Sequence, residues 1–286
     1  MKKIAFATCA RYPDLTEDDR LMIEPLRRRG IEVNPLIWDS GLALTRSSDS
    51  VVIRSCWDYH LKPLRFLRWV RQMEEQGSGL WNPARAVEWN LNKIYLRDLI
   101  RQGVAAPETV WLEQGADADL QRVLEEQNWR MAVVKPLISA TAYRTWVTSP
   151  ETAGREQNAF AELLSESGAM VQQFVKEVQT RGECSLIFFG GKYSHAVLKK
   201  PKTGDFRVQE EYGGASKSVT AAASLIEQAR RIIEFIPDRL LFARVDVVEV
   251  NGALQLMELE LIEPFLFLYA DPLASDRFAD AIVSLC

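Results

Sequence analysis

A single stretch near the end of the chain, residues 242–264 (FARVDVVEVNGALQLMELELIEP), constrains the fold most. Two strand-like runs flank Asn251-Gly252, and this pair between alternating apolar residues predicts a tight hairpin. Glu258 and Glu260 are two residues apart, so they share one face of the second strand, and Asp246 on the first strand can lie across from them. The stretch therefore predicts an antiparallel pair that carries three carboxylates on one face.

Three converging carboxylates repel one another and are costly to bury unless a cation lies between them. Hard oxygen ligands with no His or Cys nearby suit Mg²⁺, which keeps several waters and completes its shell with substrate phosphates. The alternative is an ordinary sheet with a solvated acidic face. The residues alone leave both interpretations open.

Composition bounds the class of protein. The 286 residues are enough for one large or two moderate domains, and 47% hydrophobic with 26% charged residues is typical of a soluble globular chain. A net charge of -4 and a pI near 5.5 disfavour nucleic acid as a partner.

The cysteines and the apolar runs point to the same compartment. The four cysteines are far apart and form no CxxC pair, so neither a zinc cluster nor a disulfide framework is indicated. No stretch approaches the roughly 18 apolar residues of a membrane span, and the apolar run after the basic start is too short for a signal peptide. We expect no membrane association and a cytoplasmic location.

The first third of the chain predicts a small α/β domain over residues 1–84. Strands at 4–9, 31–38 and 51–56 alternate with a helical segment that opens at Thr16 and closes at Gly30, and a helix is expected at about 62–76. Ligands of parallel sheets bind at the carboxyl ends of the strands, where RSCWDYH would present Arg54, Asp58 and Tyr59 to a small zwitterion. A loop that simply packs on a tryptophan is comparably favoured.

The remaining two thirds read as two α+β units, 85–175 and 176–286. Strands are expected at 108–112, 131–136, 169–175, 183–191 and 192–201, and helices at about 90–102, 117–128, 150–166, 218–236 and 272–284. The first helix would carry Lys93, and Lys135 ends an apolar strand, where a lysine is poorly placed for packing unless its ammonium group reaches the surface.

Two segments resemble the ATP-grasp superfamily, in the branch of ribosomal-protein glutamate ligases and bacterial glutathione synthetase. They are GDFRVQEEYGGA (204–215) and VDVVEVNGALQLMELELIEP (245–264), and the similarity extends over about residues 85–266. The resemblance implies an α/β (α+β) ATP-grasp fold, in which two lobes enclose ATP behind an N-terminal α/β domain. It also implies a carboxylate–amine ligase that uses ATP and Mg²⁺, with Mn²⁺ as an alternative ion, and works through an acyl phosphate.

The same resemblance implies roles for individual residues. Asp246, Glu258 and Glu260 would hold the metal, with Glu260 in place of the family's usual Asn. Lys93 and Lys135 would bind phosphates, Glu183 the ribose, and Arg207 the transferring phosphoryl group, so that Arg207 and Lys135 are the expected catalytic residues. The further expected contacts are an adenine hinge at Gln173, Phe174 and Val175, and assistance from Lys199. Tyr143 and Arg144, in a glycine-poor loop at 137–146, are expected to reach inward to the substrate.

Two of these expectations are weak on the residues alone. Lys199 stands beside Lys200 and Lys202, so it is individually expected to be solvated. His60 and His195 are far apart in sequence and are expected to be structural rather than general bases.

The first part of the chain indicates which class of substrate to expect. Together ATCARYPDLTEDDR, RSCWDYH, NPARAVEWNLNKIYL and ELELIEP resemble the O-ureido-serine cyclo-ligases of cycloserine biosynthesis. This implies a small amino-acid substrate bound near Arg54 and Tyr59, and dimerisation. Another amino-acid or peptide ligase is also compatible. Outside the ligases, a non-catalytic nucleotide-binding protein and a small-molecule kinase are the alternatives.

Overall fold

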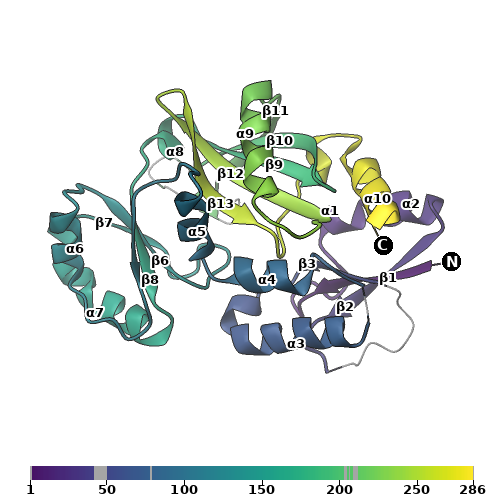
Figure 1. The fold of residues 1–286 in the computed structure, drawn as a ribbon, viewed down its shortest axis with the longest axis horizontal. Helices are drawn as coiled ribbons and strands as arrows, with labels where there is room; N and C mark the ends of the chain where they lie inside the picture. The colour runs from purple at the N-terminus through teal and green to yellow at the C-terminus, as the bar shows by residue number, and fades with distance from the viewer. Residues whose placement is uncertain are drawn as a thin grey trace.

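The computed structural model describes residues 2–41, 50–77, 79–202, 205, 207–208 and 212–285. Three sheets surround a central region, with the first sheet and the C-terminal helix on one side and a separate four-stranded lobe on the other (Figure 1). The mixed α/β class expected from the sequence is confirmed. Among the described residues, no helix is long and apolar enough to span a membrane.

The first sheet has the order β2-β1-β3-β4, and all its pairs are parallel, as predicted. Its strands are β1 (Lys2–Thr8), β2 (Ile31–Ile37), β3 (Ser50–Ser55) and β4 (Gly79–Trp81). The helices of this region are α1 (Glu17–Arg20), α2 (Ile23–Arg28) and α3 (Pro63–Glu75), with a 3₁₀ turn, η1 (Tyr59–Leu61). Thr16 caps α1 as expected, since its hydroxyl accepts from the Asp19 N–H at 3.1 Å, but the predicted helical segment is two short helices.

The middle sheet is antiparallel, with the order β5-β8-β6-β7. Its strands are β5 (Thr109–Leu112), β6 (Ala132–Pro136), β7 (Trp146–Thr148) and β8 (Ala169–Gln173), and its helices are α6 (Leu120–Glu126) and α7 (Pro150–Glu166). Leu124 and Phe160 from the helices pack on Val134 and Val171 of the sheet, so this lobe has a core of its own.

The third sheet is antiparallel, with the order β11-β10-β9-β12-β13. Its strands are β9 (Glu183–Phe189), β10 (Lys192–Lys200), β11 (Ala215–Val219), β12 (Phe242–Val250) and β13 (Ala253–Glu260). Around it lie α4 (Ala84–Leu91), α5 (Tyr95–Arg101), α8 (Glu177–Thr180), α9 (Ala223–Glu234), η3 (Leu268–Ala270) and α10 (Ala274–Leu285). The predicted helix at 90–102 is wrong in detail, because α4 and α5 are separate and Lys93 lies between them.

The two faces of the third sheet pack differently. Leu186 and Val245 lie in a cluster with α5 and α9, whereas Ile187 and Phe242 lie in a cluster with α10 and the first sheet. Because side chains alternate along a strand, the face of Ile187 also carries Glu183 and Ser185 further along β9. The second face is therefore apolar at one end and polar at the other.

The predicted hairpin is confirmed. Asn251 and Gly252 have φ values of 52° and 81°, which is the left-handed conformation that a type I′ turn needs at both central positions. Asp246 then lies directly opposite Glu258, and a bulge follows between Asp246 and Val247. This register brings the acidic residues of the two strands together.

Candidate active site

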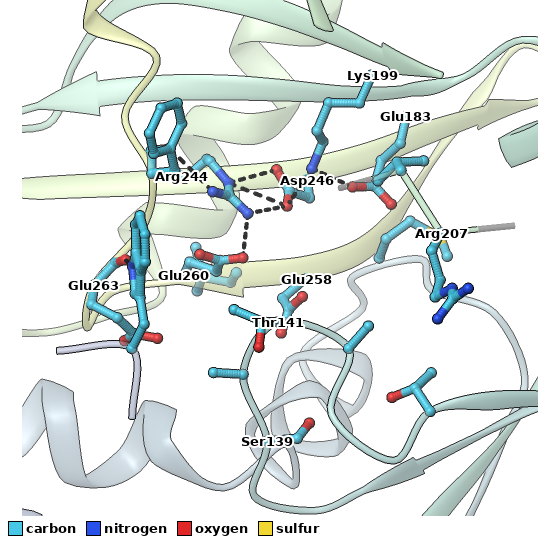
Figure 2. A pocket seen from close by; sticks show the side chains of 18 of the residues that line it. Ser139, Thr141, Glu183, Lys199, Arg207, Arg244, Asp246, Glu258, Glu260 and Glu263 are labelled. Carbon is cyan, nitrogen blue, oxygen red and sulfur yellow. Dashed lines mark hydrogen bonds and ion pairs between the residues drawn. The ribbon is translucent and has the colours of Figure 1, made fainter. Parts of the chain in front are cut away.

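A pocket of about 670 Å³ lies where the three sheets meet. The middle sheet contributes Lys135 and Gln172 to its wall, the third sheet contributes the acidic residues, and the N-terminal region contributes Tyr12, Trp57 and Tyr59. Figure 2 shows that the labelled charged side chains gather on one wall, with Ser139 and Thr141 on the loop opposite.

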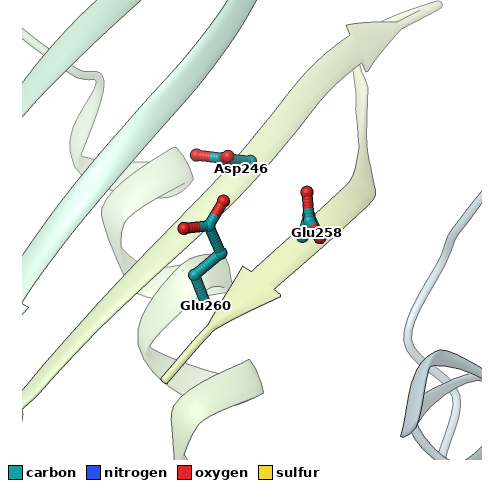
Figure 3. A group of neighbouring side chains, drawn as sticks. All are labelled: Asp246, Glu258 and Glu260. Atoms are coloured by element: carbon teal, nitrogen blue, oxygen red, sulfur yellow. The ribbon is translucent and has the colours of Figure 1, made fainter. Parts of the chain in front are cut away.

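The three predicted metal ligands converge. Asp246, Glu258 and Glu260 each offer a carboxylate oxygen, and these oxygens all lie within 4.8 Å of one another. Figure 3 shows the three side chains on two neighbouring strands, around a shared space. The geometry therefore brings together the carboxylates that the hairpin pattern predicted.

Cations surround these carboxylates. Asp246 accepts from Arg244 Nη2 at 2.9 Å, from Lys199 Nζ at 3.0 Å and from Ser185 Oγ at 2.6 Å. Arg244 also pairs with Glu260, and Lys93 pairs with Glu258. The sequence interpretation missed Arg244, although its position two residues before Asp246 places it on the same face of β12.

The expectation that Lys199 is solvated is wrong. Its side chain belongs to the pocket face of β10, where the residue is 5% exposed and its Nζ lies 2.6 Å from Glu183 and 3.0 Å from Asp246. Lys200 points the other way and is exposed. The basic composition of the segment hid the alternation that separates the two lysines.

The cations set the ionisation of the acids. Burial would raise the pKa of Asp246, but Arg244 and Lys199 hold that pKa well below its usual range. Burial would likewise raise the pKa of Glu258, yet the Lys93 ammonium outweighs it and lowers the pKa. At Glu260 burial outweighs the Arg244 charge and raises the pKa to about 7. Asp246 and Glu258 are thus charged at neutral pH, and Glu260 is divided between two states.

Lys135 differs from the other lysines of the pocket. Its Nζ donates to the neutral amide oxygen of Gln172 at 2.9 Å. Burial lowers its pKa, and the Lys93 charge lowers it further, while the charges of Glu258 and Glu183 oppose this shift. Its ammonium therefore donates to a partner that carries no charge, which suits an anionic ligand.

The expected nucleotide contacts line the same pocket. Gln173, Phe174 and Val175 lie at and after the end of β8, and Glu183 pairs with Lys199. The N–H groups of Gln173 and Phe174 already donate to the carbonyls of Glu108 and Met131, at 2.8 and 3.1 Å. An adenine at this hinge would therefore meet their carbonyl oxygens or the main chain of Val175.

Arg207 lines the pocket from the glycine-bounded connection. Its guanidinium pairs with Asp205 at 2.8 Å and lies 3.8 Å from the centre of the Tyr212 ring. The Tyr212 hydroxyl in turn donates to the Thr141 carbonyl at 3.1 Å. The rest of the predicted 204–215 motif lies partly outside the described residues.

Of the five residues expected to meet the substrate, Tyr59 lines the pocket, whereas Arg54, Asp58, Tyr143 and Arg144 lie away from its lining. Arg54 is 2% exposed, pairs with Asp19 at 2.9 Å and donates to the Pro264 carbonyl at 3.0 Å, so its guanidinium is engaged within the protein and not in the pocket. Asp58 accepts from Trp38 Nε1 at 2.7 Å. These two side chains hold the N-terminal region together instead.

The side chains of Tyr143 and Arg144 also point elsewhere. Arg144 pairs with Glu166 and lies 3.5 Å from Glu162, on α7. The Tyr143 ring packs on His60 at 5.0 Å between centroids. In the loop at 137–146, Thr141, Ala142 and Arg144 adopt positive φ values, and Thr141 and Ala142 line the pocket instead.

His195 is structural, as expected. It is buried, and its Nε2 lies 2.9 Å from the Leu266 carbonyl and 3.1 Å from that of Phe267. The imidazole therefore holds the chain beyond Pro264 and is engaged away from the pocket.

Comparison with known families gives two matches. A model for the N-terminal domain of D-cycloserine synthetase DcsG matches residues 4–82. A model for the ATP-grasp domain of prokaryotic glutathione synthetase matches residues 101–265. Together the two models account for most of the chain.

Comparison with individual proteins agrees with the two family matches. The cycloserine biosynthesis protein DcsG of Streptomyces lavendulae is 31% identical over 299 residues, covering 98% of this chain and 97% of that protein. The crystal structure of D-cycloserine synthetase DcsG superposes with a TM-score of 0.89 at 26% identity, covering 99% of each chain. D-alanine–D-alanine ligase from Bacillus anthracis, complexed with ATP, shares the fold with a TM-score of 0.71 at 14% identity, over 100% of this chain and 97% of that one.

Proposed function

We propose a reaction for this chain from the premise that it belongs to the ATP-grasp ligases. It uses ATP and Mg²⁺ to convert a carboxylate of a small amino acid or peptide into an acyl phosphate, which a nitrogen then captures as an amide. The observation that carries the proposal is the convergence of Asp246, Glu258 and Glu260 beside the lysines of one pocket. The similarity to DcsG along nearly the whole chain supports it.

The residues at the carboxylate cluster fit magnesium. Their donors are hard oxygens, no His or Cys belongs to the cluster within the described part of the chain, and Asp246 and Glu258 are ionised at neutral pH. Asp246, Glu258 and Glu260 would hold the ion, which would supply positive charge to the nucleotide phosphates. Glu260 stands where the resemblance expects an Asn, and Arg244 pairs with this additional carboxylate.

The protein's own cations would neutralise much of the negative charge of the phosphates. Lys135 and Lys93 would bind phosphate oxygens, and Arg207 would face the transferring phosphoryl group. A substrate carboxylate oxygen attacks the γ-phosphorus, the bond to the β–γ bridging oxygen breaks, and ADP leaves. The nitrogen then attacks the acyl carbon and loses a proton, and inorganic phosphate leaves.

We further propose that the nitrogen belongs to the same molecule as the carboxylate, in the manner of an O-ureido-serine cyclo-ligase. The support is the match of residues 4–82 to the N-terminal domain of DcsG, since this region contributes Tyr12, Trp57 and Tyr59 to the pocket. Holding both ends of one molecule removes the entropy cost of bringing two reactants together.

The test is magnesium-dependent ADP release from the purified protein against a panel of amino acids that includes both enantiomers of O-ureido-serine. Release stimulated by a panel member, and lost in Asp246→Ala and Glu258→Ala, is the expected result. Glu249→Ala serves as control, because Glu249 is an exposed acid on β12 that pairs with Arg181.

Product analysis by mass spectrometry completes this test. A new amide or ring, with release of inorganic phosphate, supports the ligase. A stable phosphate ester would identify a small-molecule kinase. Binding of ATP with no stimulated turnover, and with the two variants behaving like the wild type, would refute the proposed carboxylate–metal site.

A further inference from the structure

Glu263 lies in the pocket at the end away from the expected nucleotide site. Figure 2 places it on the opposite side of Glu260 and Asp246 from Glu183 and Arg207. It follows Glu260 by three residues, on the segment that leaves β13. A carboxylate at this end would meet the substrate rather than the nucleotide.

The Glu263 carboxylate has no partner among the residues that the structure describes. Across the described residues, no hydrogen bond or ion pair reaches its side-chain oxygens. Three nearby cations of the pocket pair with other acids: Lys93 with Glu258, Arg244 with Asp246 and Glu260, and Lys199 with Glu183 and Asp246. Burial and the charges of Glu260 and Glu258 raise the pKa of Glu263 well above its usual range, so its charged form needs a countercharge that a ligand cation would supply.

The backbone that carries Glu263 is fixed by side chains from distant parts of the sequence. Trp57 Nε1 donates to the Glu263 carbonyl at 3.0 Å, Arg54 to the Pro264 carbonyl at 3.0 Å, and Arg244 Nη1 to the Phe265 carbonyl at 3.1 Å. Such anchoring fixes the backbone from which the carboxylate extends before a ligand arrives, which lowers the entropy cost of binding.

Aromatic rings line the same part of the pocket. Tyr12 and Trp57 have ring centroids 5.1 Å apart, Trp57 and Phe265 are 6.2 Å apart, and Phe265 and Phe267 are 4.9 Å apart. Aromatic faces attract cations, and together with a carboxylate they form a surface suited to an ammonium group.

We propose that Glu263 binds the ammonium group of the amino-acid substrate, so that the enzyme selects substrates with a free amine beside the carboxylate that it activates. The inference rests on the proposed function, because that function identifies which end of the pocket binds the substrate. Glu263 is then a specificity-determining residue, and the aromatic rings shield its ion pair from water.

The experiment compares ligands that differ only at the amine. The protein is loaded with Mg²⁺ and a non-hydrolysable ATP analogue and titrated calorimetrically with O-ureido-serine and a set of α-amino acids, each beside its N-acetyl derivative. The variants are Glu263→Gln, which cannot carry a negative charge, and Glu263→Asp, which keeps an ionisable carboxyl on a shorter side chain. Glu17→Gln is the matched control, because Glu17 is an exposed acid in the lining of the same pocket.

The expected result is that the wild type binds the amine-bearing member of a pair about tenfold or more tightly than its N-acetyl derivative. Glu263→Gln should lose that preference and leave affinity for the ATP analogue unchanged. Glu263→Asp should keep part of the preference, and Glu17→Gln all of it. Equal binding of both members by the wild type, no binding of any amine-bearing member, or an undiminished preference in Glu263→Gln would overturn the inference.

Turnover separates this inference from the proposed function. A preference that depends on Glu263, together with a protein that forms no amide from any panel member, would keep the ammonium site and refute the ligase. Amide formation with a preference that does not depend on Glu263 would do the reverse.

Discussion

Replacing Lys199 with methionine would remove a buried ammonium group that lies between two carboxylates. Lys199 is 5% exposed, and its Nζ lies 2.6 Å from Glu183 and 3.0 Å from Asp246. Removing a single partner of a buried ion pair costs about 3–5 kcal/mol, because the remaining charge stays buried. Asp246 retains Arg244 and Ser185, so the loss falls mainly on Glu183, and we expect the free energy of unfolding to fall by about 3 kcal/mol.

The assay is urea unfolding followed by tryptophan fluorescence, in a buffer with EDTA and without nucleotide, so that no ligand supplies charge. Lys200→Met is the matched control, since it removes the same group from the next position of β10, where the side chain is exposed. We expect the control to change stability by about 0.5 kcal/mol or less. A Lys199→Met protein within about 1 kcal/mol of the wild type would refute the charge argument.

Three further predictions concern the framework of the site. Burial and the charge of Asp19 raise the pKa of Asp18 to about 6, against the opposing effects of Arg54 and the N–H groups of Leu268 and Tyr269. The stability that the protonated form of Asp18 contributes is present below pH 3.8 and is lost as pH rises through about 6. Urea unfolding should therefore show Asp18→Asn to be about 1–3 kcal/mol more stable than the wild type at pH 7.5 and nearly equal to it at pH 4. The opposite pH trend would contradict this. Arg54→Met should lower the free energy of unfolding by about 3 kcal/mol because it leaves Asp19 unpaired; a raised KM with unchanged stability would instead restore a substrate role. Asn82→Ala should destabilise the protein by about 3 kcal/mol or more, and Asn90→Ala by about 2 kcal/mol. The reason is that the buried amide of Asn82 makes three hydrogen bonds of 2.9 Å or shorter to β12, β13 and their adjoining residues, and that of Asn90 makes two. The reverse order of the urea midpoints would contradict this hydrogen-bond count.

Local chemistry explains which parts of the site the sequence could predict. Asn251-Gly252 specifies its turn through two residues that tolerate positive φ, and the period of two along β13 then places Glu258 and Glu260 on one face. Both facts depend on neighbours in the chain. The acidic cluster could therefore be predicted before the fold was known.

Other parts depend on distant contacts. Arg54 is buried because Asp19, 35 residues away, pairs with it, and nothing around Arg54 in the sequence indicates that partner. The strands β4 and β7 have three residues each and lie at sheet edges, and β11 is an edge strand within a segment taken partly for a helix. Short edge strands form because a neighbouring strand supplies the hydrogen bonds, so their own residues carry little signal.

The apolar end of the third sheet has a consequence for exchanging parts of this protein. Phe6 of β1, Phe189 of β9 and Phe278 of α10 belong to a single buried cluster. A chimera that takes residues 2–82 from a relative would therefore join surfaces that did not evolve together, unless it also takes the matching α10.

The middle lobe is the opposite case. Its cluster draws its buried residues from positions 120–171, within one continuous segment. Recombination should thus succeed more readily by replacing that segment than by replacing the front of the chain. The first sheet, in contrast, shares its buried cluster with α10, so the two ends of the described chain would have to be exchanged together.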